Sequence, residues 1–264
     1  MLSAIRAPLP VSRLRRARLA EARAALASDE SAWTLPATPA PSGDQLAELK
    51  SRLLQLCAVT ARGQAAGLFT ERIDLEDVVL RLEDCAADAK FQQAGTWRLV
   101  YSNVEPFRSS PFFAAFQAAV GSEDVASAVF RLTAALPVAG SSGAMGAVTQ
   151  RVSLPPSGEG RLVSEVRLSL YGLLSGTVVT EARLRQDEAD PRGTLRCVVE
   201  STRVADSSLP FSLDSIVAPV ETAFAALKGA PLEVMLHCRF ADDSLRIVRT
   251  GERQDQIFVY AREA

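Results

Sequence analysis

The repeat of apolar residues along the chain changes near Gly95, from helical spacing to strand spacing. Upstream, leucines recur three or four residues apart, as on one face of a helix. These leucines are Leu46, Leu49, Leu53 and Leu56. The pattern predicts helices over residues 44–60 and 74–89, and Asp44 is positioned to cap the first of them.

Downstream of Gly95, apolar and polar residues alternate in short segments separated by Gly, Pro and Asp, which is typical of strands. The expected strands are Trp97–Tyr101, Met145–Leu154, Arg161–Leu170, Gly176–Arg185, Thr194–Val204, Leu232–Phe240, Ser244–Thr250 and Gln256–Arg262. Short helices are expected at 111–120 and 219–227. Because long helices do not alternate with these strands, the chain is expected to be mainly β, with an antiparallel β-barrel or strongly curved sheet over residues 95–262.

The triplet Gly95-Thr96-Trp97 opens the first expected strand. In small calyx-shaped barrels a G-x-W at this place lays the indole across the closed end, and an arginine of a late strand stacks on it. Arg246 and Arg249 are the late-strand arginines expected to do so here.

Residues 1–42 read as a separate segment. Residues 1–30 hold six arginines, and the first acid of the chain is Glu21. This composition favours an organellar transit peptide, with a basic surface helix as the alternative. A Pro-rich run from Pro36 to Pro41 follows and predicts a linker. The folded domain is therefore expected over residues 43–264.

Composition narrows the class of protein. Of the 264 residues, 48% are hydrophobic and 23% charged, which is ample for a sizeable core. No run approaches the roughly 18 apolar residues of a membrane span. The net charge of −2 includes the basic N-terminal segment, so the folded part is more acidic still. Nucleic acid is therefore not an expected partner.

Candidate catalytic groups are few. The only histidine, His237, falls inside an expected strand, where it is either a structural residue or a base. Cys57, Cys85, Cys197 and Cys238 form no CxxC pair and are expected to be free thiols. The glycine-rich stretch 139–146 lacks the Lys-Ser/Thr of a phosphate loop. The sequence predicts no cofactor, no metal site and no catalytic residue.

Several segments together resemble the plastid lipid-associated proteins, or plastid fibrillins. They are LLQLCAVTARG, DLEDVVLRLED, GTWRLVYSN and the closing DDSLRIVRTGERQDQIFVYARE, with FRSSPFFAAFQ, GAVTQRVSL and RLVSEVRL between them. The resemblance covers residues 44–262. It departs from the family in DCAADAKFQQAG, which replaces an Asn-Pro-rich turn, and at Arg249-Thr250-Gly251, where the family has Arg-Gly.

The resemblance implies a lipocalin-like barrel in the chloroplast, associated with plastoglobules or thylakoid membrane. It implies a ligand that is a lipid, quinone, carotenoid or other isoprenoid, and no catalytic residue. The family's recurrent positions are matched by Trp97, Tyr101, Gln150, Asp242, Arg246 and Arg249. Asp242 with Arg246 or Arg249 is expected either to form an ion pair that fixes the last strands or to contact the ligand.

A cluster of aromatic residues lies between the first two expected strands. It consists of Phe107, Phe112, Phe113 and Phe116, with Arg108 beside it. The segment 106–120 is expected either to bind a lipid surface with one amphipathic face or to plug the barrel mouth.

Three functions follow from these features. The barrel holds an apolar ligand, or it is a filled barrel that coats or assembles on a membrane or lipid droplet. The third is an enzyme that acts on a lipid or isoprenoid with Asp242, Tyr171 or Glu165 as acid or base. The sequence favours the binding module and does not indicate an oligomeric state.

Overall fold

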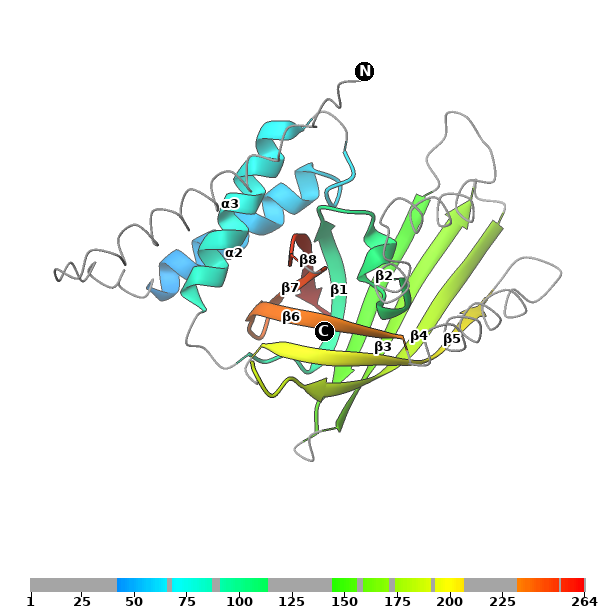
Figure 1. Ribbon diagram of the computed structural model, residues 1–264. Coiled ribbons are helices and arrows are strands. Elements are labelled where there is room, and N and C mark those ends of the chain that lie inside the picture. The colour runs from blue at the N-terminus through cyan, green and yellow to red at the C-terminus, as the bar shows by residue number, and fades with distance from the viewer. Residues whose placement is uncertain are drawn as a thin grey trace, which may run out of the picture.

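The computed structural model describes residues 42–65, 68–86, 91–113, 144–155, 159–170, 174–190, 193–206, 232–251 and 253–263 (Figure 1). Several expectations therefore lie wholly or mostly outside the described residues. They are the transit peptide and Pro-rich linker of residues 1–42, the helices at 111–120 and 219–227, Phe116 and Tyr171.

Two helices precede the sheet, α2 (Gly43–Val59) and α3 (Phe69–Cys85). The cap of α2 is Ser42, not Asp44. The Ser42 hydroxyl accepts from the Gln45 amide, and the Gln45 side chain accepts from the Ser42 amide, which makes a capping box. The helix α3 begins five residues before the expected position. The apolar pattern missed its first turn because the apolar residues there face solvent: Phe69 is 67% exposed and Ile73 39%.

Eight strands follow, with one 3-10 turn, η1 (Pro106–Ser109), after the first of them. The strands are β1 (Gly95–Ser102), β2 (Ala144–Ser153), β3 (Glu159–Leu170), β4 (Leu174–Gln186), β5 (Thr194–Ala205), β6 (Glu233–Ala241), β7 (Leu245–Thr250) and β8 (Gln256–Arg262). Each pairs antiparallel with the next along the chain, and β8 pairs with β1 to close the ring. The prediction of a mainly β fold, with antiparallel strands closed into a ring behind two helices, is confirmed.

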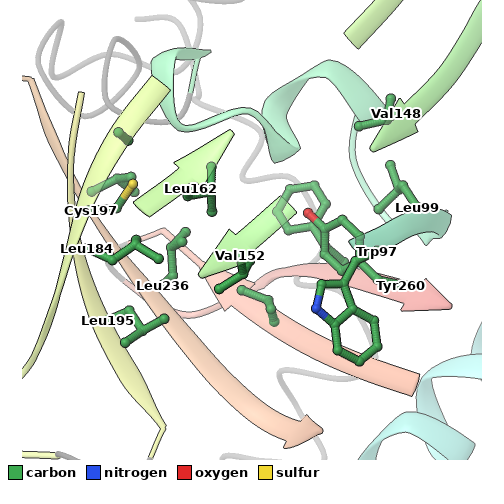
Figure 2. Packing of buried hydrophobic residues seen from close by; sticks show 14 of the residues in the cluster. Trp97, Leu99, Val148, Val152, Leu162, Leu184, Leu195, Cys197, Leu236 and Tyr260 are labelled. Atoms are coloured by element: carbon green, nitrogen blue, oxygen red, sulfur yellow. The ribbon is translucent and has the colours of Figure 1, made fainter. Parts of the chain in front are cut away.

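The inner faces of the strands meet in one apolar core. Trp97, Leu99, Phe258 and Tyr260 enter it from β1 and β8 and are at most 2% exposed. Figure 2 shows Trp97, Leu99, Tyr260 and other labelled side chains of the cluster directed into the space between the strands. Because successive residues of a strand in a closed sheet face inward and outward in turn, the inward apolar residues gather in this core.

A second core lies outside the ring, where α2 and α3 cover β1, β6, β7 and β8 (Figure 1). The helices contribute Leu53, Leu75 and Leu82, each 0% exposed, and the strands contribute Ile247 and Val259. The strands β7 and β8 are consequently buried on both faces, which accounts for the apolar run Ile257–Ala261 in β8.

A register shift in β1 divides its residues between the two cores. The shift lies between Leu99 and Tyr101 against β8. Trp97 and Leu99 point into the ring, whereas Tyr101 belongs to the outer core under the helices. An extra residue in one strand of a pair exchanges the faces of all residues beyond it.

Gly63 fixes the exit of α2 against the end of β1. Its φ of +85° lies in the left-handed region, and a Cβ at this position would stand 2.1 Å from the Ser102 carbonyl oxygen. The helix pair is therefore joined to the barrel by a contact that only glycine permits.

Candidate functional site

A belt of polar side chains runs around one level of the barrel interior. Gln150 of β2 lies opposite Ser164 of β3, Ser164 opposite Thr180 of β4, and Thr180 opposite Thr202 of β5. All four are at most 7% exposed. The Ser164 hydroxyl has no hydrogen-bond partner. A core that served packing alone would have apolar residues at these positions, because buried polar groups cost free energy unless they are paired.

Arg246 of β7 reaches this belt from another part of the ring. It is 0% exposed, and its Nη1 donates to Gln150 Oε1 over 3.2 Å. Its guanidinium carbon lies 5.6 Å from the centroid of the Tyr260 ring. Its Nε and Nη2 have no hydrogen-bond partner, and no carboxylate of the described residues forms an ion pair with it. A fully buried positive charge is thus held by one amide, one aromatic ring and a contact with the Cys238 thiol.

The groups around this guanidinium are uncharged. Burial raises the pKa of Cys197 to about 12 and that of Cys238 to about 11, and the positive charge of Arg246 opposes both shifts. Burial also raises the pKa of Tyr260 to about 12, against the opposing effects of Arg246 and of a hydrogen bond with Ser109. The thiols and the phenol therefore stay protonated at neutral pH and do not balance the charge.

The 3-10 turn η1 connects the belt to the aromatic segment. Gln150 Nε2 donates to the Ser109 carbonyl over 2.8 Å. The next residue, Ser110, is 0% exposed, and its hydroxyl lies 3.1 Å from that of Thr180. The turn is therefore tied to two members of the belt, on β2 and β4.

The aromatic residues beside η1 lie against the barrel. Phe107 and Phe113 pack on the interior cluster, and their rings meet edge to face at 5.1 Å between centroids. Phe112 is 6% exposed and contacts Phe113 in the same manner at 5.3 Å. These positions match the barrel-mouth alternative for the segment, and its contact with a lipid surface stays a prediction.

The arginine that stacks on Trp97 is Arg262, so the prediction of Arg246 or Arg249 is wrong. The Arg262 guanidinium carbon lies 4.4 Å from the centroid of the indole, which is 0% exposed. The residues are brought together by ring closure, because Trp97 and Arg262 are opposite each other in the β1–β8 pair. A Cβ on Gly95 would lie 2.2 Å from Arg262 Nη1, so the glycine of the G-x-W triplet makes room for this arginine.

Asp242 pairs with neither expected arginine. Its Oδ2 accepts from Lys50 Nζ of α2 over 2.8 Å, and its Oδ1 accepts from the amides of Ser244 and Leu245. Burial acts to raise the pKa of Asp242, but the hydrogen bonds from Lys50, Leu245 and Ser244 outweigh it and lower the pKa. The carboxylate holds the β6–β7 turn to α2, outside the barrel interior.

Arg249 points to the helices as well. Its Nε and Nη2 bind the two carboxylate oxygens of Glu83 in α3, at 2.5 and 3.0 Å. Of the recurrent positions matched by the family resemblance, the structure brings Trp97, Gln150 and Arg246 to the interior. It places Tyr101, Asp242 and Arg249 on the helix side.

The proposed acids and bases among the described residues, Asp242 and Glu165, lie away from the interior belt. Glu165 pairs with Arg151 on the outer face of the barrel. His237 of β6 is 3.0 Å from the Thr194 hydroxyl, which donates in turn to Asp190. Burial, and then the charge of Arg239, lower the pKa of His237. The four cysteines are free, as expected.

The residues missed at the sequence level fall into two groups. Ser164, Thr180 and Thr202 occupy inward positions that strand alternation could have identified, had polar residues there been read as a set. The partners Lys50, Glu83 and Arg262 come from distant parts of the chain, and strand spacing carries no signal for them.

The described part of the chain contains no group of three or more residues suited to hold a metal ion. Within the same residues, no helix has both the length and the apolarity to cross a membrane. Comparison of the whole chain with protein-family models gives no match, and comparison with curated proteins gives none either.

Proposed function

We propose that this protein is a non-catalytic binding module, a lipocalin-like barrel that takes an apolar molecule into its interior. The observation that carries the proposal is the buried Arg246, whose guanidinium edge has no partner inside a ring lined by apolar side chains and one belt of uncharged polar ones. A filled structural core gains nothing from such a group, whereas a binding site uses a few polar groups to orient an apolar ligand.

The apolar lining supports the same function. Val148, Leu162, Val166 and Leu236 line the interior together with the aromatic residues of β1 and β8. Burial of a ligand against such a surface stabilises a complex by about 25 cal/mol per Å² of apolar area. Affinity would come from the lining, and orientation from the polar belt.

The resemblance to plastid fibrillins extends the proposal to location and ligand class. The Arg-rich residues 1–30 would direct the chain to the chloroplast, where it would associate with plastoglobules or thylakoid membrane. The ligand class would be a lipid, quinone, carotenoid or other isoprenoid.

A second function, a coat or assembly protein with a filled barrel, is favoured by one observation. Trp97, Phe258 and Tyr260 are all at most 1% exposed within the interior cluster, so large side chains already occupy the part of the ring near β1 and β8. In this case the protein would act through its outer surface and the rim around Phe107 and Phe113.

The test is native mass spectrometry with lipid extraction, on the full chain imported into and purified from plastids. A stoichiometric lipid or isoprenoid would support the binding module. An empty protein that still floats with plastid-lipid vesicles would favour the coat. An empty protein that neither floats nor binds added apolar molecules would refute both.

The location is tested separately with a fluorescent fusion. The full chain should accumulate in plastids, and a chain that lacks residues 1–41 should not. Equal distribution of the two fusions would contradict the targeting role of the N-terminal segment.

A further inference from the structure

We propose that the ligand of the barrel carries a carboxylate, and that Arg246 binds this carboxylate with the edge formed by its Nε and Nη2. The inference rests on the proposed binding function and names the chemistry of the ligand's polar end. The candidate ligands are therefore long-chain monocarboxylates rather than neutral lipids or hydrocarbons.

The geometry of the guanidinium carries the first step. Nη1 is used by Gln150, and the two nitrogens without a partner are Nε and Nη2. These two N–H groups point in parallel from one edge of the planar group, and their separation matches the two oxygens of a carboxylate. The unpartnered atoms thus form one complete binding edge rather than two scattered donors.

The same protein shows this edge in use. Arg249, three residues along β7, binds Glu83 through its own Nε and Nη2, one oxygen to each nitrogen. Arg246 and Arg249 lie on opposite faces of one strand, one toward the interior and one toward α3. Outside the ring, the Nε–Nη2 edge of Arg249 binds a protein carboxylate. Inside the ring, the same edge of Arg246 has no partner.

Charge carries the second step. An arginine stays protonated in any protein environment, so Arg246 cannot relieve its burial by losing a proton. Two other buried arginines of the described chain have acidic partners, Arg108 with Glu105 and Arg249 with Glu83. Arg246 has no such partner and is more deeply buried than either. A negative ligand would supply the counter-charge.

The surroundings select an amphiphile rather than a small anion. Beside the guanidinium lies the polar belt, with the free Ser164 hydroxyl next to Gln150 in register. Beyond the belt the lining is apolar, with Leu162, Val166 and Val148 on β2 and β3. An apolar tail fits this lining, and small hydrated anions would gain nothing from it.

The experiment measures binding of oleate, below its micellar concentration, and of methyl oleate, below its solubility limit, by displacement of a neutral fluorescent apolar dye from the full-length protein. The ester has the same tail and keeps a carbonyl oxygen but has no charge. We expect the wild-type protein to bind oleate about ten- to hundredfold more tightly than the ester, as a charge-assisted bidentate contact provides.

Three variants assign this preference to Arg246. Arg246→Gln should lose the preference for the acid and keep the affinity for the ester. Arg246→Lys, which keeps the charge without the planar edge, should retain only part of it. Arg183→Gln is the matched control, because Arg183 presents the same two nitrogens to Glu200 on the outer face. It should behave as wild type.

Stability without ligand gives an independent readout. Arg246→Met removes a buried unpaired charge and should leave the unfolding midpoint unchanged or raise it. Arg249→Met, which leaves the Glu83 carboxylate without its ion-pair partner, should lower the midpoint. A fall in Arg246→Met as large as in Arg249→Met would assign Arg246 a structural role and overturn the inference.

The results of these binding measurements distinguish a failure of the carboxylate site from a failure of the proposed apolar-binding function. Equal affinity of the wild-type protein for acid and ester, or an unchanged preference in Arg246→Gln, would overturn the carboxylate site and leave apolar binding standing. Failure of both oleate and its ester to displace the dye, with no dye bound in the interior, would overturn the proposed function itself.

Discussion

The outer wall of the barrel has two halves that are built differently. Over β1, β6, β7 and β8 the outward residues are apolar and lie beneath α2 and α3 (Figure 1). From β2 to β5, and at the start of β6, many outward residues are charged, and ion pairs link each strand to the next. These pairs are Arg151–Glu165, Arg161–Glu181, Arg185–Glu159, Arg183–Glu200 and Arg196–Glu233.

The difference shows how one closed sheet meets two environments. The charged side chains of the wall over β2–β5 are hydrated or paired with one another, so no helix is needed to shield this wall from water. The other wall depends on the helices, since its apolar side chains would otherwise be exposed to water. The cover is anchored by charge as well, through Glu83–Arg249 and Lys50–Asp242. Folding stability should therefore be concentrated on the helix side.

The largest effect is expected at the ion pair between helix and barrel. Glu83→Ala leaves the buried Arg249 guanidinium without its partner, and the side chains of the pair are only 11% and 5% exposed. We expect a loss of about 3–5 kcal/mol in the free energy of unfolding, measured by urea denaturation. The double variant Glu83→Met, Arg249→Met should recover most of this loss. A loss under about 1 kcal/mol in the single variant would contradict the anchoring role.

Substitutions in the apolar faces of α2 and α3 should lower the free energy of unfolding by nearly as much. Leu75 of α3 is 0% exposed, and Leu75→Ala should cost about 2–5 kcal/mol, because it removes buried methyl groups and leaves a cavity. Leu54→Ala is the matched control on α2, where the side chain is 41% exposed, and it should change stability by about 0.5 kcal/mol or less. Similar losses in the two variants would mean that the helices do not pack as described.

The second anchor should show itself through pH. The folded pKa of Asp242 is lower than that of the unfolded chain, so its carboxylate adds stability above about pH 4. This contribution is lost as the pH falls through the folded pKa. Asp242→Asn should cost about 1–2 kcal/mol at pH 7 and should flatten the acid limb of the stability curve. Denaturant titrations across the pH range measure both effects, and an acid limb as steep as that of wild type would show that another group causes it.

The smallest effect is expected on the uncovered wall. The Arg161 side chain is 61% exposed, and Arg161→Ala should change the free energy of unfolding by about 0.5 kcal/mol or less. Salt screens surface pairs, so the difference between variant and wild type should shrink further in molar salt. A loss above about 1.5 kcal/mol would show that the two walls are more alike than their side chains indicate.

Strand content was largely predictable from the sequence, because alternation and turn residues are local signals. All eight strands lie where the period of two placed them, and β8 begins and ends at the expected residues. The start of α3 was not predictable in this way, since Phe69 and Ile73 face solvent and break the apolar stripe.

The site was predictable only in part. Gln150 and Arg246 were identified through the family resemblance, and the structure joins them by a hydrogen bond. The stacking of Arg262 on Trp97 depends on the register between the first and last strands, which no local pattern encodes. The position of Tyr101 depends on a single irregularity in β1, which reverses its face.

The pairing of β8 with β1 has a consequence for crowded surroundings. Because the ring is closed, every strand of the described sheet pairs with a neighbour on both sides, and no strand forms an open edge of the sheet. A chain that ends before Gln256 would open two such edges at once, on β7 and β1. Truncation or misfolding of the last seven residues of the ring should therefore convert a self-contained protein into one that aggregates by strand addition.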